Sequence, residues 1–252
     1  MYILAVETTG PVGSAAIIDD QGAVSVEISS EEMNHLKDLM PMAERLLSRL
    51  NIQARDLTAA AASIGPGSFT GIRIGVAAAR AVAQALDIPV IAVPTLDSFK
   101  LMCADRSLTV PIFNARRGQV YGGVFDEKAE DVLKSGPYML TDVLSSISSY
   151  LSVHPGINVN FYGDGVDAYE QELTEFKGQH AAANIGFADK AARYQTAEMT
   201  ARVALEKFRR GEILSVDELL PDYMRTTEAE QKLKDGTLAK ERAAKMERFR
   251  SR

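Results

Sequence analysis

Short runs of apolar residues, separated by Gly, Pro and Asp, follow one another along the first thirty residues of the chain. The runs lie at 2–7, 13–18 and 23–28, and their length and spacing predict three strands that form a meander. From residue 33 to Leu50 the apolar residues recur at spacings of three and four, which predicts an amphipathic helix of about four turns. The pattern then predicts a strand, an Ala-rich helix and a further strand, at 59–64, about 70–86 and 90–93.

A second round of strands and helices follows after about residue 104. The pattern predicts strands at 109–114, 119–125 and 159–162, and helices at 141–151, 169–176 and 188–210. The two halves share this order but not their sequence. A duplicated order of this kind predicts an α/β protein of two similar lobes, in which mixed sheets are flanked by helices and a cleft lies between the lobes. We place the lobes at 1–104 and 105–225, and a basic tail, helical or frayed, at 226–252.

Composition and charge narrow the class of protein. The 252 residues are 46% apolar and 25% charged, which excludes a disordered or fibrous chain. The net charge of -6 is not the basic footprint of a nucleic-acid binder, so any RNA contact must be local or belong to a partner. The segment 225–252 carries nine Lys or Arg against five Asp or Glu, which is typical of a solvated tail or of a local contact with phosphates.

Cysteine usage and the N-terminus indicate the compartment. Cys103 is the one cysteine, which excludes an internal disulfide framework and fits a reducing environment. No apolar run approaches the ~18 residues of a spanning helix, and no basic segment precedes the first apolar run. We therefore expect a cytoplasmic protein without membrane contact.

The glycine-rich segment 65–75, Gly-Pro-Gly-Ser-Phe-Thr-Gly-Ile-Arg-Ile-Gly, is the most informative stretch of the chain. Its first glycines permit a sharp reversal from strand to helix, and Ser68 or Thr70 can cap the helix that follows. A helix start of this kind could hold an anion, but no Lys follows and the third Gly falls one place late for a dinucleotide motif. Small residues four apart form a stripe that suits either packing on the sheet or a subunit interface, at Gly71, Gly75, Ala79 and Ala83.

Motifs of a self-sufficient catalyst are missing from the sequence. It contains no H-E-x-x-H and no G-x-S-x-G, and its three histidines, His35, His154 and His180, are too far apart for one metal-binding helix face. Glu7, at the end of the first strand, is interpreted as a turn carboxylate, with the positioning of a metal-bound water as the alternative. In the segment 114–118, Asn-Ala-Arg-Arg-Gly, two arginines replace the small residues that let a backbone approach a phosphate.

Several of these segments together resemble one known family. They are Ile3–Thr9, His35 at the start of the first helix, 65–75, Val93–Leu96, Asn114–Tyr121 and Pro221–Arg225. On them the chain resembles the TsaB (YeaZ) family of the actin-like ATPase superfamily, over nearly its whole length. The resemblance implies two tandem RNase H-like, actin-like lobes. The family usually has Asp where this chain has Asn114, which weakens any cation site at that position.

The resemblance also implies a function. A TsaB-type chain is a non-catalytic subunit of the machinery that places threonylcarbamoyl on N6 of adenosine 37 in tRNA. It forms a heterodimer with TsaD, which transfers the group made by a TsaC-type enzyme, and TsaE is the ATPase; tRNA is met through the complex. TsaD-like chains carry His-x-x-x-His where this chain has Thr95 and Phe99, and these two side chains cannot replace imidazoles as metal ligands. We expect no cofactor in this chain, with ATP and metal in the partner subunits.

In the family, the contact between the partners is a bundle of corresponding helices. Carried over to this chain, it would use Leu36, Leu39, Met40, Leu46, Gly71, Ile72, Gly75 and Ala79, and a leucine at position 75 would weaken pairing. Three alternatives stay open. One is an actin-like kinase or ATPase whose first phosphate loop is formed by Glu7, Thr8, Thr9 and Gly10. The others are an inactive metallopeptidase homologue and a homodimer that forms in the absence of the partner.

Overall fold

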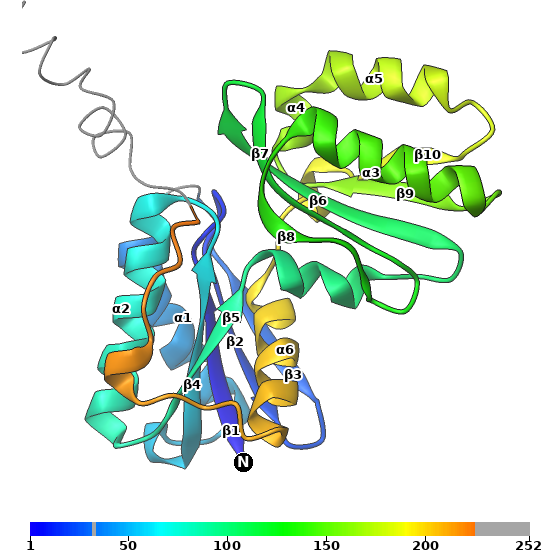
Figure 1. The fold of residues 1–252 in the computed structure, drawn as a ribbon. Coiled ribbons are helices and arrows are strands. Elements are labelled where there is room, and N and C mark those ends of the chain that lie inside the picture. The colour runs from blue at the N-terminus through cyan, green and yellow to red at the C-terminus, as the bar shows by residue number, and fades with distance from the viewer. Residues whose placement is uncertain (32–33, 225–252) are drawn as a thin grey trace, which may run out of the picture.

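Two five-stranded mixed sheets form the framework of the computed structural model, which describes residues 1–31 and 34–224 (Figure 1). The first sheet has the order β3-β2-β1-β4-β5. Its strands are β1 (Tyr2–Glu7), β2 (Ser14–Asp19), β3 (Val24–Ile28), β4 (Leu57–Gly65) and β5 (Val90–Pro94). The second sheet has the order β10-β9-β6-β7-β8. Its strands are β6 (Ser107–Arg116), β7 (Gln119–Phe125), β8 (Asp131–Met139), β9 (Asn158–Tyr162) and β10 (Ile185–Phe187).

The two sheets repeat one topology. In each sheet, the first three strands along the chain form antiparallel pairs. The fourth strand pairs parallel with the first, and the fifth pairs parallel with the fourth. Parallel pairs need a crossover, which helices supply in both halves. The predicted fold class, two similar α/β lobes with mixed sheets flanked by helices, is therefore confirmed.

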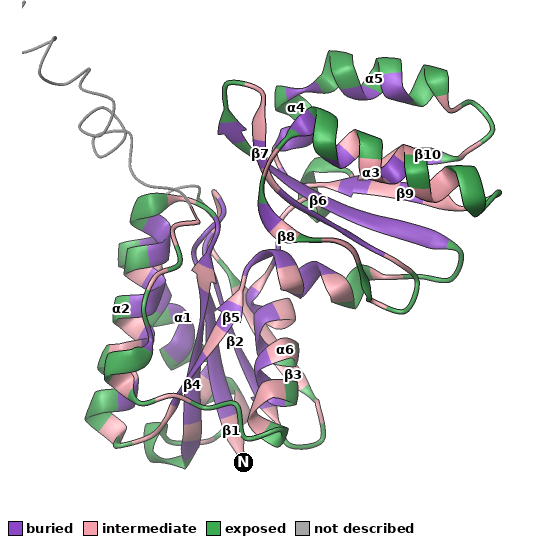
Figure 2. Ribbon diagram, viewed as in Figure 1, coloured by how far each residue is buried: buried purple, intermediate pink, exposed green. Residues whose placement is uncertain are grey.

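Helices cover both faces of the first sheet, which explains why β1 and β4 are almost continuously apolar. On one face lie α1 (His35–Leu50) and α2 (Phe69–Leu86), which turn their buried sides to the sheet and their exposed sides outward (Figure 2). On the other face lies α6 (Ala197–Arg209). There it packs small side chains, Ala197, Ala201 and Ala204, against an apolar sheet face that includes Ile3 and Ala5.

The end of the described chain returns to the first lobe, whereas the prediction assigned all residues from 105 to 225 to the second lobe. After β10 the chain forms a short turn at η3 (Lys190–Ala192) and enters α6 only at Ala197, so the predicted helix 188–210 begins nine residues too early. Beyond α6, Leu214 pairs with Val90, and the Asp222 backbone N–H donates to the Ile64 carbonyl at 2.8 Å. Without this cover, the second apolar face of the first sheet would be exposed to water. No local sequence pattern shows which later helix covers it. The predicted tail 226–252 lies outside the described residues.

The second lobe is covered on one face by α3 (Leu140–Val153), α4 (Gly165–Ala168) and α5 (Glu170–Gln179). Against its other face lies η2 (Leu96–Met102), in a cluster of Leu96, Phe99, Phe113 and Phe125. The sequence pattern missed β8 and β10 because β8 is a half-exposed edge strand containing Gly136 and Pro137, and β10 is only three residues long. Within the described residues, no helix is long and apolar enough to cross a membrane.

The small-residue stripe of α2 packs inside the first lobe. A Cβ atom on Gly71 would lie 1.9 Å from the Thr8 carbonyl oxygen, and one on Gly75 would lie 2.4 Å from Thr8 Oγ1. The Thr8 hydroxyl donates to the Gly71 carbonyl at 2.7 Å. Ala79 and Ala83 continue the stripe into the same core. Of the two uses open to the stripe, the structure shows the intramolecular one, because glycine alone lets α2 come this close to the turn after β1.

Gly75→Leu is therefore expected to lower the free energy of unfolding, by about 1–3 kcal/mol, because the new side chain overpacks a filled site. Chemical denaturation would measure the decrease. Ala77→Leu, on the exposed side of the same helix, is the matched control and should leave stability nearly unchanged. Equal stability of the two variants would contradict the packing role of Gly75.

Candidate functional site

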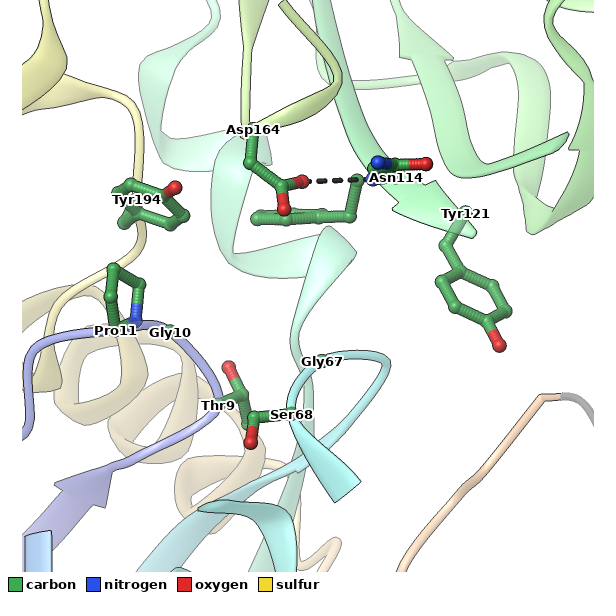
Figure 3. Close-up of a pocket in the computed structure, with 10 residues that line it drawn as sticks. Thr9, Gly10, Pro11, Gly67, Ser68, Asn114, Tyr121, Asp164 and Tyr194 are labelled. Atoms are coloured by element: carbon green, nitrogen blue, oxygen red, sulfur yellow. Dashed lines mark hydrogen bonds between the residues drawn. The ribbon is translucent and has the colours of Figure 1, made fainter. Parts of the chain in front are cut away.

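A cavity of about 330 Å³ lies between the two lobes (Figure 3). The first lobe contributes the turn after β1 and the start of α2. The second contributes the ends of β6 and β9 and the start of β7, and the segment before α6 closes the remaining side. The lining residues are Thr9, Gly10, Pro11, Gly67, Ser68, Phe113, Asn114, Tyr121, Asp164 and Tyr194. The predicted cleft therefore exists and takes residues from both halves of the chain.

Close contacts and hydrogen bonds within the first lobe hold the first wall of the cavity together. A Cβ atom on Gly67 would lie 2.6 Å from Thr9 Cβ, so only glycine fits there. The Ser68 backbone N–H donates to the Thr9 carbonyl at 2.8 Å, and the Ser68 hydroxyl accepts from the Gly71 N–H at 3.2 Å. Ser68 is thus the helix cap, as expected. Two N–H groups at this helix start, those of Ser68 and Gly71, are thus engaged within the chain.

Glu7 is fully buried behind this wall and does not line the cavity. Its carboxylate accepts hydrogen bonds from the Thr9 backbone N–H at 2.5 Å, the Thr9 hydroxyl at 2.6 Å and the Gln195 amide at 3.2 Å. Gln195 belongs to the segment between the lobes, so this network joins the turn after β1 to the inter-lobe connection. Burial raises the pKa of the Glu7 carboxyl above its usual range, and hydrogen bonds from Ser63, Thr9 and Gln195 lower it in part. The position of Glu7 matches the turn carboxylate predicted from the sequence.

The second wall combines one carboxylate with aromatic rings. Asp164 accepts the Asn114 backbone N–H at 2.8 Å, and burial raises the pKa of the Asp164 carboxyl. The Asn114 side-chain oxygen accepts from the Arg116 N–H at 2.8 Å and from the Tyr169 hydroxyl at 3.2 Å. The asparagine therefore closes the β6–β7 hairpin. Phe113 and Tyr194 pack beside each other, with their ring centroids 6.2 Å apart.

These walls do not fit a nucleoside triphosphate. Phosphates are held by backbone N–H groups, basic side chains or a metal ion. No Lys or Arg belongs to the lining residues of this cavity, whose charged group is a carboxylate. Of the four residues proposed as a first phosphate loop, Glu7 and Thr8 are buried and bonded elsewhere, and only Thr9 and Gly10 face the cavity.

Thr95 and Phe99, which the resemblance places where TsaD-like chains carry histidines, are completely or almost completely buried. The Thr95 N–H donates to the Gly65 carbonyl at 2.8 Å, and the Phe99 ring lies 5.9 Å from that of Phe113 and 5.5 Å from that of Tyr162. Phe99 thus packs against the second lobe, whereas the Thr95 hydrogen bond lies within the first lobe. In the described part of the chain, no group of three or more His, Cys, Asp or Glu is arranged to hold a metal ion.

The structure separates the three histidines, as their spacing predicts. His35 is buried at the start of α1 against Gly13, and neither ring nitrogen has a hydrogen-bond partner among the described residues. His154 stacks on Tyr150 at the end of α3, with ring centroids 4.0 Å apart. His180 follows α5.

The structure divides the eight predicted interface residues into two groups. Six lie inside the first lobe, where they pack against the sheet or the Thr8 turn: Leu39, Leu46, Gly71, Ile72, Gly75 and Ala79. These six residues lie on the sheet-facing sides of α1 and α2, and the use of the two helices by a partner stays a prediction. Leu36 and Met40 are 79% and 38% exposed and stand one turn apart on α1. Phe69, 40% exposed at the start of α2, is a surface apolar residue that the sequence reasoning missed because it lies within the glycine-rich segment.

Comparison with known proteins decides the family. The family model described as TsaD: tRNA N6-adenosine threonylcarbamoyltransferase matches residues 16–233. The tRNA threonylcarbamoyladenosine biosynthesis protein TsaB of Bacillus subtilis is 33% identical over 240 residues, which span 92% of this chain and 97% of that protein. The chain belongs to the TsaB (YeaZ) family.

Other members agree with this assignment to the TsaB family. The TsaB protein of Escherichia coli is 27% identical over 248 residues, and the match spans 92% of this chain and 98% of that protein. The solved structure of YeaZ from Pseudomonas aeruginosa superimposes with a TM-score of 0.67 at 22% identity, covering 88% of this chain and 99% of that one. The TsaB-type fold thus extends over both lobes.

The buried Glu7 carboxyl predicts a pH-dependent stability difference from Glu7→Gln. Because burial raises the folded-state pKa above the ordinary value near 4.5, the folded protein keeps its proton at pH values where the unfolded chain has released it. Wild-type stability should therefore fall, relative to Glu7→Gln, as the pH rises from about 4.5 through the raised pKa of the folded state.

Urea denaturation at several pH values between about 4.5 and 8 measures this difference. Glu44→Gln, on the exposed side of α1, controls for the general effect of removing a carboxylate. A difference between wild type and Glu7→Gln that does not change with pH would show that the Glu7 carboxyl titrates alike in both states.

Proposed function

We propose that this chain is a non-catalytic subunit of the machinery that forms N6-threonylcarbamoyladenosine in tRNA, and that it pairs with a TsaD-type transferase. Its similarity to TsaB proteins, named for this biosynthesis, extends over 97% and 98% of their lengths. The TsaD family model also matches most of the chain, which supports a common fold with the transferase. Partnership with a TsaE-type ATPase, contact with tRNA through the complex and a place in the cytoplasm belong to the same proposal.

The composition of the cleft supports a non-catalytic role. Its lining supplies no basic side chain for phosphates. Phe99 fills a hydrophobic cluster at the place where the paralogue has a metal-binding histidine. The kinase and metallopeptidase alternatives therefore find no matching arrangement among the described residues.

The observation that supports pairing with TsaD is the exposure of three apolar side chains near the starts of α1 and α2. We name Leu36, Met40 and Phe69 the helix-start surface. α1 and α2 both begin at the end of the lobe where β1 and β4 finish, so their first turns lie at the same end of the sheet. A paralogue of the same topology presents corresponding helices there, and burying one Leu or Met side chain contributes about 1.5–3 kcal/mol.

The double variant Leu36→Glu/Met40→Glu should bind TsaD at least tenfold more weakly, since a decrease of about 1.4 kcal/mol in binding free energy already gives that factor. Isothermal titration calorimetry with purified TsaD measures the affinity. Val153→Glu replaces a 70% exposed apolar residue of the second lobe and serves as the control. Equal affinity for wild type and double variant would remove the helix-start surface from the interface.

A second copy of this chain is the competing occupant of the same surface. If the isolated chain forms a homodimer through the helix-start surface, its mass by light scattering rises with concentration, and the double variant stays monomeric. Added TsaD should then compete with the self-association. A homodimer that does not dissociate when TsaD is added would contradict the proposed heterodimer.

Reconstitution tests the proposed role directly. tRNA, threonine, bicarbonate and ATP are incubated with TsaC-type, TsaD and TsaE proteins, with and without this chain, and modified adenosine is scored by mass spectrometry. Product should require both this chain and TsaD. Product without TsaD would show that the cleft of this chain performs the transfer, and product without this chain would overturn the proposed role.

A further inference from the structure

Two segments that lie far apart in the sequence meet beside the start of α2. They are the glycine-rich segment 65–75 and the segment 221–225. The rings of Phe69 and Tyr223 lie beside each other, with their centroids 4.8 Å apart. The Arg73 guanidinium stacks over the Phe69 ring, 4.0 Å from its centroid, and lies 5.7 Å from the centroid of Tyr223. We name these three residues the arginine cluster.

The arginine cluster is held in place by contacts of the backbone beside it. The Asp222 N–H donates to the Ile64 carbonyl at 2.8 Å, and a Cβ atom on Gly65 would lie 2.3 Å from the Asp222 carbonyl oxygen. The segment that carries Tyr223 is thus fixed against the first lobe. The Tyr223 hydroxyl accepts the Arg73 Nε–H at 2.9 Å. The guanidinium is therefore oriented in advance, which reduces the entropy cost when its other N–H groups bind a ligand.

The terminal nitrogens of Arg73 have no hydrogen bond or ion pair with any residue in the described ranges 1–31 and 34–224. The neighbouring Asp222 carboxylate instead accepts the Met224 N–H at 3.0 Å. Further along α2, Arg80 does have an acidic partner, Asp217, at 3.1 Å. Because the Nε–H of Arg73 is already used, an acceptor has to approach the end of its guanidinium. The parallel N–H groups at that end match the two oxygens of a carboxylate.

The arginine cluster adjoins the helix-start surface. Arg73 is exposed and stands one turn after Phe69 on the same side of α2. α1, which carries Leu36 and Met40, lies beside α2 on the same face of the first sheet (Figure 1). A protein that covers the helix-start surface would also remove water from the guanidinium. A desolvated charge without a partner is costly, so a binding protein that fits this surface has to supply an anionic group.

We propose that Arg73 pairs with an Asp or Glu carboxylate of the TsaD-type transferase that packs on the helix-start surface. This inference rests on the proposed function, which supplies the partner. Burial of the apolar side chains supplies affinity, and the ion pair fixes how the partner's helices are placed. Tyr223 acts through Arg73 and is a positioning residue.

Arg73→Met removes the charge and keeps an unbranched side chain that can cover Phe69. Its affinity for TsaD should fall about tenfold or more, because the partner's carboxylate is left desolvated and unpaired. The association rate should also depend less on salt, since screening acts on charges. Surface plasmon resonance over a salt series measures both quantities. Tyr223→Phe keeps the ring and the charge, so it should lower the affinity less and leave the salt dependence unchanged.

Arg55→Met is the matched control. Arg55 is an exposed arginine of η1 (Ala54–Asp56), which precedes β4, so it lies at the other end of that strand from the start of α2. The control should bind TsaD like wild type, and thermal denaturation verifies that every variant folds. Wild-type affinity and salt dependence in Arg73→Met would overturn the inference, as would an equal effect of Arg55→Met.

Carbodiimide coupling of the heterodimer tests whether the group opposite Arg73 is a carboxylate. Arg73→Lys replaces the guanidinium by a primary amine. The carbodiimide activates a carboxylate, the amine attacks it to form an amide bond, and the carbodiimide leaves as a urea. Mass spectrometry of the digested product should find position 73 linked to an Asp or Glu of TsaD. Links from position 73 only to carboxylates of this chain would overturn the inference.

Failure of this inference is distinguishable from failure of the proposed function. The wild-type chain is first mixed with TsaD and analysed by size-exclusion chromatography. If no heterodimer forms, the proposed function fails at that step. If it forms and Arg73→Met binds TsaD like wild type, only the ion pair is wrong. Normal TsaD binding by Arg73→Met, together with weaker tRNA binding by its heterodimer, would assign the arginine to the nucleic acid and would also overturn the inference.

Discussion

The close approach of α2 to the turn after β1 is the contact on which the cleft depends. Gly71 and Gly75 let the helix backbone reach Thr8, and the hydrogen bond from Thr8 to the Gly71 carbonyl joins the two segments. The same approach brings Gly67 and Ser68 against Thr9. A larger side chain at any of these glycines would push α2 outward and separate the first wall of the cavity from its support.

Two further sets of contacts connect that wall to the second lobe. The buried Glu7 carboxyl binds Thr9 and Gln195, which ties the turn after β1 to the segment between the lobes. Phe99 packs against Phe113 and Tyr162 and so adds an aromatic cluster between η2 and the second sheet. These buried groups therefore build the contact between the first wall of the cavity, the inter-lobe segment and the second lobe.

This arrangement agrees with the proposed role of the chain, in which its surfaces rather than its cleft are used. The cavity offers a carboxylate and aromatic rings, whereas the exposed apolar side chains Leu36, Met40 and Phe69 lie on the outer surface. Burial of such side chains against a protein partner would supply affinity.

The sequence by itself determined the order of most strands and helices, the duplicated α/β class and the family, and it restricted the cap of α2 to Ser68 or Thr70, of which the structure uses Ser68. These features depend on apolar periodicity, on turn residues and on motifs that are local in the chain. Tertiary structure decided that α6 covers the first sheet, because any amphipathic helix from either half could fill that face. It also decided that Leu39, Leu46 and Ile72 face inward while Leu36 and Met40 face outward. The periodicity shows that a helix has an apolar side, but when apolar residues extend around it, only packing against the sheet selects which of them remain on the surface.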